Sequence, residues 1–409
     1  MPKTIVHVLD TFPSKSETFI INHIIECERK GFKSIILANK LKPLNEGSQE
    51  DLITEYGLNI GAKSYNQKLP KNKILRIFKA LILLLQNLSN YKVFFRTLND
   101  KKFGLKSKTL KMWFQAAVFI EYKNCSILHA HFGVNGKLLA DMRAIGALKG
   151  RIVTSFYGYD TFSTLANRVV LKDYYESVFF ASDKLITSSN YLYANLEKFD
   201  VPKQKLIVNP VGVDLNRFGY KKRDYKNILN IITVGRLIEL KGQHFGIEAI
   251  HILLKKGYNI NYTIVGDGEE EKSLKEKIIK LELQDNIKIV AGGTQTKVCK
   301  LLQNNHVFLM TSITDKTGRA EGQGLVIAEA QATGLPIVAF DSGGVKDTFI
   351  HNKTGFLAEE KNTQQIAEFL EKFILNSELI NQMGYDAMCF VKEHFNSEKQ
   401  SEKLIELYN

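Results

Sequence analysis

The sequence predicts an α/β protein with two doubly wound, parallel-sheet domains that face a central cleft. The chain has 409 residues. A single hydrophobic core usually organises a shorter chain than this. Short apolar runs alternate with helical patterns, which is typical of parallel sheets covered on both faces. This alternation restarts after a polar join at residues 208–226, so we expect each half to form its own domain.

The first half contains five apolar runs that we expect to form strands. They are Thr4–Leu9, Ser34–Leu37, Ser126–Ala130, Ile152–Phe156 and Lys184–Thr187. The second half repeats the pattern, with strands expected within 228–237, 262–268, 287–290, 306–312, 335–340 and 354–358. In such folds the ligand binds outside the carboxyl ends of the strands.

Charge is distributed unevenly along the chain. The net charge is +13, of which residues 1–200 carry +12 and segment 68–123 alone carries +11, from 13 basic and 2 acidic side chains. Such asymmetry favours an anionic partner for the first half. The longest apolar stretch, Ala80–Leu85, is too short to span a bilayer. Four scattered cysteines and no recognisable signal peptide predict a cytoplasmic protein without structural disulfides or a zinc site.

Segment 68–123 interleaves its basic residues with Leu, Ile, Phe and the single Trp. One interpretation is an amphipathic basic helix on an anionic membrane surface. An equally good one is a helical pair that covers the N-terminal core and turns a solvated basic face outward. Nucleic acid is a poorer candidate, because no recognised nucleic-acid-binding module accompanies the charge.

The densest cluster of functional residue types is "RAEGQGLVIAEAQATGLPIVAFDSGG", residues 319–344. Glu321 and Glu329 lie eight positions apart where a loop is expected to enter a helix. Gly322 and Gly324 allow close backbone approach, and a helix that begins near Leu325 would offer free N–H groups to an anion. Two carboxylates at a helix start are common in any protein, so the neighbouring residues decide between a site and a plain helix.

Those neighbours produce a family resemblance. Glu-x7-Glu, then Glu-Ala and Gly-x-Pro-Ile-Val, resembles the donor-site signature of family 4 glycosyltransferases. The resemblance implies the GT-B fold, in which two Rossmann-like domains enclose a cleft, and a retaining, metal-independent transfer of sugar from a nucleotide diphosphate. It further implies that Glu321 orients the sugar and Glu329 binds the ribose.

Further segments match the same family pattern. Gly235, Arg236 and Lys241 in "VGRLIELKG" are similar to its diphosphate-binding residues, where Arg binds in a bidentate way and Lys acts as a point charge. Gly266 lies in a Val-Gly-x-Gly turn. Val290 and Gly292 lie where the family holds the nucleobase. Gly322, Gly324 and Leu325 complete the implied donor site.

The N-terminal half carries candidates for the other wall of the cleft. His129 and His131 form an H-x-H pair on one strand, a possible metal pair for which the sequence offers no evident third ligand. The resemblance makes His131 the contact to the donor sugar, whereas we expect His129 to pack in the core. "VTSFYGYDTF" matches a family segment but has Tyr157 where histidine is common. Asp160 would line the acceptor cleft or cap the next helix.

The loop "FPSKSETFI", residues 12–20, is typical of the colanic-acid and exopolysaccharide subgroup of the family. Ser14 and Glu17 have the spacing of a capping box, which predicts helix initiation. Ser16 and Thr18 would face the cleft as an acceptor or phosphate loop.

The prediction is therefore a hexosyltransferase of surface polysaccharide biosynthesis that needs no cofactor. We expect an acceptor domain at 1–207, a linker at 208–226, a nucleotide-sugar domain at 227–382 and returning helices at 383–409. A UDP- or GDP-sugar would be the donor, and a saccharide or lipid-linked saccharide the acceptor. The alternatives are a sugar-nucleotide epimerase or hydrolase of the same fold, and a non-catalytic basic protein that binds membranes or polysaccharide.

Overall fold

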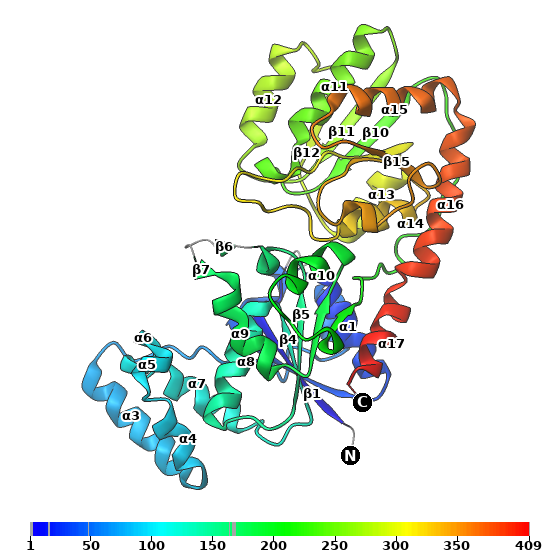
Figure 1. Cartoon of the computed structure of the whole chain (residues 1–409). Helices are drawn as coiled ribbons and strands as arrows, with labels where there is room; N and C mark the ends of the chain where they lie inside the picture. The colour runs from blue at the N-terminus through cyan, green and yellow to red at the C-terminus, as the bar shows by residue number, and fades with distance from the viewer. Residues whose placement is uncertain (1–2, 15–16, 48, 163, 166–168, 409) are drawn as a thin grey trace.

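The computed structural model describes residues 3–14, 17–47, 49–162, 164–165 and 169–408. It consists of two α/β domains, one above the other in Figure 1, each built on a parallel sheet with helices on both faces. The predicted fold class is confirmed.

The described part of the N-terminal domain contains a seven-stranded parallel sheet in the order β3-β2-β1-β4-β5-β8-β9. Its strands are β1 (Thr4–Phe12), β2 (Lys33–Leu41), β3 (Lys63–Ser64), β4 (Ile127–His131), β5 (Arg151–Phe156), β8 (Lys184–Thr187) and β9 (Leu206–Val208). β6 (Thr164–Leu165) pairs antiparallel with β7 (Val169–Val170) in a separate small sheet. The helices outside segment 68–123 are α1 (Thr18–Arg29), α2 (Glu50–Glu55), α8 (Gly133–Ile145), α9 (Leu171–Ala181) and α10 (Asn190–Glu197).

The described part of the C-terminal domain has a six-stranded sheet in the order β12-β11-β10-β13-β14-β15. Its strands are β10 (Leu229–Val234), β11 (Ile260–Val265), β12 (Ile287–Val290), β13 (Val307–Met310), β14 (Ile337–Phe340) and β15 (Gly355–Ala358). Its helices are α11 (Gln243–Lys255), α12 (Glu271–Lys280), α13 (Gln295–Gln303), α14 (Leu325–Ala332), α15 (Thr363–Leu375) and α16 (Glu378–His394). Every residue of β13 and β14 is buried, as expected for strands with helices on both faces.

Both sheets reverse their strand order beside the first strand, between β1 and β4 and between β10 and β13. A crevice opens at such a switch point, on the side where the strands end. The polar loops that follow β10, β13 and β14 lie at this edge, and the loops after β5 and β8 approach them from the other domain.

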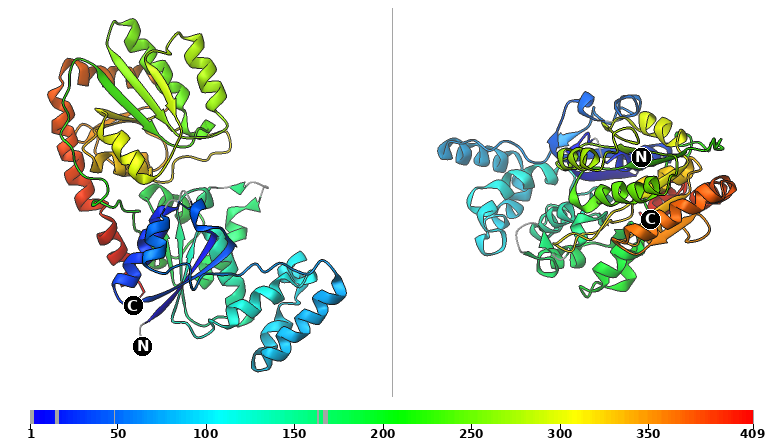
Figure 2. Two further views of the ribbon diagram at one scale, coloured as in Figure 1. Left: turned by 180° about the vertical axis from the view of Figure 1, so that it is seen from behind. Right: turned by 90° about the horizontal axis from the view of Figure 1, so that it is seen from above.

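Segment 68–123 forms a helical lobe beside the N-terminal sheet (Figure 1). The lobe comprises α3 (Lys73–Gln86), α4 (Tyr91–Arg96), α5 (Asp100–Phe103), α6 (Leu105–Lys108) and α7 (Lys111–Ile120). Helix α7 is buried along its length after Lys111 and supplies the inner side of the lobe. The two views of Figure 2 show α3 and α4 projecting away from the rest of the molecule.

The chain crosses between the domains twice, and the two crossings run side by side. Val213 N–H donates to Phe395 O at 2.6 Å, and Ser397 N–H donates to Val213 O at 3.0 Å. A Cβ on Gly212 would lie 2.4 Å from Ser397 Cα, so only glycine fits there. Helix α16 packs on α14 of the C-terminal domain, whereas α17 (Ser397–Glu406) packs on α1 of the N-terminal domain. In the described part of the chain, no helix is both long and apolar enough to cross a membrane.

Candidate active site in the interdomain cleft

The predicted donor residues gather at the carboxyl edge of the C-terminal sheet. Gly235 and Arg236 directly follow β10, and Lys241 ends the turn that leads into α11. Gln243 Nε2 donates to Arg236 O at 2.8 Å, which fixes this turn to the start of the helix. The Arg236 side chain is exposed, and the structure records no polar partner for it among the described residues.

Lys241 and Glu321 form a direct ion pair, with both side chains about 15% exposed. Ser312 Oγ, from the loop after β13, lies 3.4 Å from Glu321 Oε2. The Glu321 backbone is anchored as well, because Gly344 N–H donates to Glu321 O at 2.8 Å. The structure thus brings one cation and one carboxylate together from segments eighty residues apart.

Other predicted donor positions lie in the neighbouring loops of the same sheet edge, where backbone segments contact one another. A Cβ on Gly266 would lie 1.9 Å from Gly235 O, so the loops after β10 and β11 touch through backbone. Val290 ends β12, and Gly292 N–H donates to Asp267 Oδ2 at 3.1 Å. Their contact with a nucleobase stays a prediction, whereas their closeness to the loop after β11 is observed.

Glu329 lies in the second turn of α14, which begins at Leu325 after the left-handed Gly324 (φ +81°). Burial raises the pKa of the Glu329 carboxyl to about 7, against the opposing effects of Arg217 and Gln295. The Arg217 guanidinium also bonds Gln295 Oε1. Glu329 therefore belongs to a cluster of polar side chains, with Arg217 and Gln295, near the carboxyl edge of the C-terminal sheet.

Gly322 is where the C-terminal donor loop meets the N-terminal domain. A Cβ at this position would lie 2.6 Å from Tyr157 O and 3.0 Å from Gly158 Cα. Ser189 Oγ donates to Gly322 O at 2.6 Å, and this bond also crosses the cleft. We expected Gly322 to admit a ligand; in the structure its bare Cα admits the backbone of the facing domain.

The segment at residues 12–20 contributes a further interdomain contact. Gln295 Nε2 donates to Thr18 Oγ1 at 3.0 Å, which places Thr18 in the cleft. Ser16 lies outside the described residues. The capping-box interpretation is wrong, because α1 begins at Thr18 and its N-cap, Glu17, makes no side-chain capping bond. Burial and the nearby Asp10 raise the pKa of the Glu17 carboxyl to about 7.

Tyr157 and Asp160 hold the loop after β5, and Tyr157 also bonds to β4. Tyr157 Oη lies 3.0 Å from His131 Nδ1. The Asp160 carboxylate accepts from Gly133 N–H at 2.8 Å, and also from the N–H groups of Tyr157 and Gly158. Because Gly133 is the first residue of α8, the fully buried Asp160 binds the start of that helix, and it lies inside the short helix Tyr159–Thr161 that follows β5. The contact of Asp160 with an acceptor stays a prediction, and so does the contact of His131 with the donor sugar.

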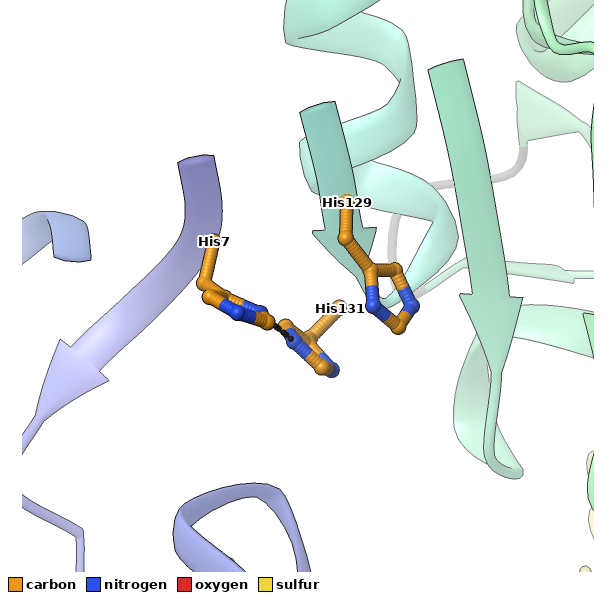
Figure 3. A group of neighbouring side chains, drawn as sticks. All are labelled: His7, His129 and His131. Atoms are coloured by element: carbon orange, nitrogen blue, oxygen red, sulfur yellow. Dashed lines mark hydrogen bonds between the residues drawn. The ribbon is translucent and has the colours of Figure 1, made fainter. Parts of the chain in front are cut away.

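Four buried histidines lie under this loop. The Nδ1 atom of His7 on β1 lies 3.2 Å from the Nε2 atom of His131 on β4 (Figure 3). Tyr408 Oη, at the end of the chain, lies 2.7 Å from both His23 Nε2 and His129 Nδ1. Burial lowers the pKa of all four rings below the ordinary value, and repulsion among the rings adds to this at His7, His129 and His131. The cluster is therefore neutral at pH 7.

This cluster supplies the third ligand that the H-x-H pair lacked in the sequence. His7, His129 and His131 each present a nitrogen, all within 4.8 Å of one another. A tetrahedral zinc site needs its nitrogens about 3.4 Å apart. Both His129 nitrogens already bond, one to Tyr408 and the other to Ser155 Oγ at 2.8 Å. A metal would have to displace part of this network, so in the present arrangement the rings form a hydrogen-bonded core.

Sequence reasoning missed several residues that the structure brings to the cleft. Arg217 and Gln295 surround Glu329, although one lies in the linker motif "NPVGVDLNRF" and the other opens α13. His7 had a usable signal: it occupies the position in β1 that pairs with His129 in β4. Two histidines aligned on neighbouring strands point to the same side of a sheet.

Two family models together match nearly the whole chain. The model described as Glycosyltransferase Family 4 matches residues 16–217, and that of the group 1 glycosyl transferases matches residues 214–388. The chain is 30% identical over 370 residues to WcaL of Escherichia coli K12, a glycosyltransferase whose name associates it with colanic acid biosynthesis, with 88% of each chain covered. The chain belongs to the family 4 glycosyltransferases. The glycosyltransferase AmsK of amylovoran biosynthesis in Erwinia amylovora is 28% identical over 403 residues, 97% of each chain.

The folds of solved structures agree with the assignment of this chain to the family 4 glycosyltransferases. HepE of Anabaena aligns with a TM-score of 0.73 at 16% identity, covering 100% of this chain and 99% of its own. Sucrose-phosphate synthase from Thermosynechococcus elongatus aligns with a TM-score of 0.72 at 15% identity, covering 100% and 98%. At these identities the likeness shows the fold, which is GT-B. The predicted family is confirmed, and the names of the relatives agree with the predicted role in polysaccharide biosynthesis.

Proposed function

We propose that this glycosyltransferase moves a hexose-type sugar from a nucleotide-diphosphate donor to an acceptor hydroxyl, with retention of anomeric configuration. The observation that carries the proposal is the Lys241–Glu321 ion pair at the carboxyl edge of the C-terminal sheet. A cation suited to a diphosphate and a carboxylate suited to sugar hydroxyls lie in contact there. The Tyr157–Gly158 loop of the other domain adjoins Gly322, the residue after Glu321.

Lys241 and Arg236 would neutralise the charge that grows on the leaving diphosphate. Fixed charges aimed at developing charge usually give an enzyme its largest rate gain. Lys241 is already held in place by Glu321, and the exposed Arg236 is free to turn toward a phosphate. These two cations would do the work of a metal ion, so we propose a reaction that is independent of metal.

Glu329 would accept hydrogen bonds from the ribose hydroxyls, and Arg217 and Gln295 beside it would fix its orientation. The base would rest on the backbone near Val290 and Gly292. HepE has been solved with UDP and with UDP-glucose, and a Mycobacterium tuberculosis relative, 24% identical over 213 residues, is named for its dependence on GDP-mannose. We therefore keep both UDP- and GDP-sugars as donor classes.

His131 is the proposed contact from the N-terminal domain to the donor sugar. It is fully buried and bonded to Tyr157, so a direct contact requires the tyrosine side chain to move when the donor binds. In the proposed reaction no side chain of the protein acts as a nucleophile. Domain closure would align donor and acceptor in a water-poor cleft.

We propose a saccharide or lipid-linked saccharide as the acceptor, in line with the polysaccharide pathways for which the relatives are named. The +11 charge of the lobe supports attachment to the cytoplasmic face of a membrane.

The test has two stages. A thermal-shift screen across UDP- and GDP-sugars identifies the donor, because a ligand that binds only the folded state raises the melting temperature. With that donor, nucleotide diphosphate should be released only when an acceptor is present, undiminished by EDTA, and NMR should show the donor's anomeric configuration in the product. Release without acceptor would favour a hydrolase or epimerase, and loss of turnover in EDTA would contradict metal independence.

A further inference from the structure

Helix α3 turns its apolar side toward solvent. Ile74, Phe78, Leu81 and Leu85 recur at helical spacing along one face and are 80%, 60%, 51% and 66% exposed. We call these four residues the α3 stripe. Within α3 the buried residue is the small Ala80. A surface helix normally has the reverse arrangement, with its large apolar side chains against the core.

The opposite side of α3 packs against the rest of the lobe. The helix that carries the exposed stripe is therefore held in a fixed position. The indole N–H of Trp113 on α7 donates to Ala80 O at 3.0 Å. The Arg76 guanidinium donates to Pro70 O at 2.7 Å and 2.9 Å. Leu83 and Leu84 pack against the core of the N-terminal domain. No described part of the chain covers the stripe.

The apolar surface continues beyond the helix. Leu88, Tyr91, Phe95 and Leu98, in and around α4, are 59%, 48%, 56% and 44% exposed. So many exposed large apolar side chains in one lobe are unusual on a soluble monomer, and contiguous apolar patches mark sites that bind a protein or a membrane.

Positive charge surrounds this surface. Lys71, Lys73 and Lys79 are exposed at the start and along the flank of α3, and the lobe as a whole carries 13 basic and 2 acidic side chains. Lysine can rest its methylene chain on an apolar surface while its ammonium group stays at the level of lipid phosphates. A basic helix with a large apolar face fits the interface of an anionic bilayer.

We propose that α3 is the membrane-inserting element of this enzyme, with the α3 stripe at the headgroup–acyl boundary of an anionic bilayer and Lys71, Lys73 and Lys79 on lipid phosphates. This inference rests on the proposed attachment of the lobe to a membrane and names the residues and the partner. A second copy of the chain is the weaker occupant of the stripe, because pairing would bring two lobes of charge +11 together.

The position of α3 gives such docking a functional consequence. The lobe belongs to the N-terminal domain and projects away from the C-terminal domain (Figures 1 and 2). Insertion would anchor the acceptor-binding domain at the bilayer and leave the donor-binding domain free to open and close. The lipid of a lipid-linked acceptor would then remain in the same bilayer during transfer.

Vesicle flotation of the full-length protein tests the proposal directly. The wild type should bind vesicles of phosphatidylcholine with 30% phosphatidylglycerol. The variant F78Q/L81Q/L85Q keeps the charge and the helix propensity of α3, and its partitioning should fall at least about 100-fold. The control I60Q/I279Q/L375Q changes three side chains that are 87%, 60% and 72% exposed elsewhere, and it should bind like the wild type.

The lysines give an independent arm. One cation near an anionic surface changes partitioning about fivefold, so K71Q/K73Q/K79Q should lose about 100-fold on anionic vesicles. Trp113 is the single tryptophan and lies beneath α3. If the fluorescence of Trp113 is unchanged in a variant, the lobe of that variant is folded. If the stripe variant fails this check, flotation of the lysine variant decides whether the lobe binds the membrane.

Equal flotation of the stripe variant and its control would overturn the proposal, as would a lysine variant that binds like the wild type. A wild-type dimer without lipid that F78Q/L81Q/L85Q converts to monomer would assign the stripe to a second copy instead. Flotation needs no turnover, so normal flotation without sugar transfer would contradict only the proposed reaction.

Discussion

Replacing Gly322 by alanine should hold the two domains apart. The new Cβ would lie 2.6 Å from Tyr157 O and 3.0 Å from Gly158 Cα. Both neighbours are backbone atoms of the opposite domain, so no flexible side chain can move aside. The clash exists only when the domains meet. The change should therefore affect closure and leave the folding of each domain nearly untouched.

The size of the effect follows from packing energetics. One extra methyl group in a tight contact costs about 1–3 kcal/mol. Since each 1.4 kcal/mol is a factor of ten, the ratio of closed to open molecules should fall about 5- to 140-fold. If the closed form is the reactive one, kcat/KM for sugar transfer should fall by a similar factor.

Steady-state kinetics and small-angle X-ray scattering check this together. Gly322→Ala should lower kcat/KM and increase the radius of gyration in the presence of donor, at an unchanged melting temperature. Gly61→Ala is the matched control, because a Cβ there meets nothing within 4 Å. Wild-type kcat/KM and an unchanged radius of gyration in Gly322→Ala would refute the role of this contact in closure.

Two further predictions concern buried polar groups. Because the Glu329 pKa is about 7 when folded and 4.5 ordinarily, the folded state holds this proton more tightly, and stability falls as pH rises from about 4.5 to about 7. Melting temperatures of the wild type should fall more steeply over this window than those of Glu329→Gln, and parallel curves would contradict the assignment. Tyr408→Phe leaves His23 Nε2 and His129 Nδ1 without their shared partner, so it should cost about 1–3 kcal/mol in denaturant unfolding. Tyr385→Phe, at a 55% exposed position, should cost nothing measurable, and equal losses would show that the buried hydroxyl has no special role.

The strands were predictable because buried parallel strands read as continuous apolar runs. The runs expected at 287–290 and Lys184–Thr187 coincide with β12 and β8. Helix starts were harder to place. Ser14 and Glu17 have capping-box spacing, yet α1 begins at Thr18. Capping patterns are local, and such local preferences yield to the packing of the rest of the fold.

The candidate site could be predicted only in part, for the same reason. Glu321 and Lys241 carry a family pattern in their own segments, and the structure shows that they form one ion pair. Contacts across domains leave no such pattern. Nothing in the sequence pairs Gly322 with Tyr157, because that contact depends on how two separately folded domains approach each other. Nothing pairs Tyr408 with His129 either, because the end of the chain returns to the N-terminal domain from far along the sequence.

The central claim is that Lys241 acts on the donor diphosphate, and a pair of lysine variants tests it. Lys241 bonds Glu321 in the cleft, whereas Lys256 bonds Glu371 at 2.7 Å on the far side of the same domain. Acceptor-dependent release of nucleotide diphosphate should fall at least about 100-fold in Lys241→Ala and stay at the wild-type level in Lys256→Ala. Turnover of Lys241→Ala within threefold of the wild type, in a folded protein, would contradict the account.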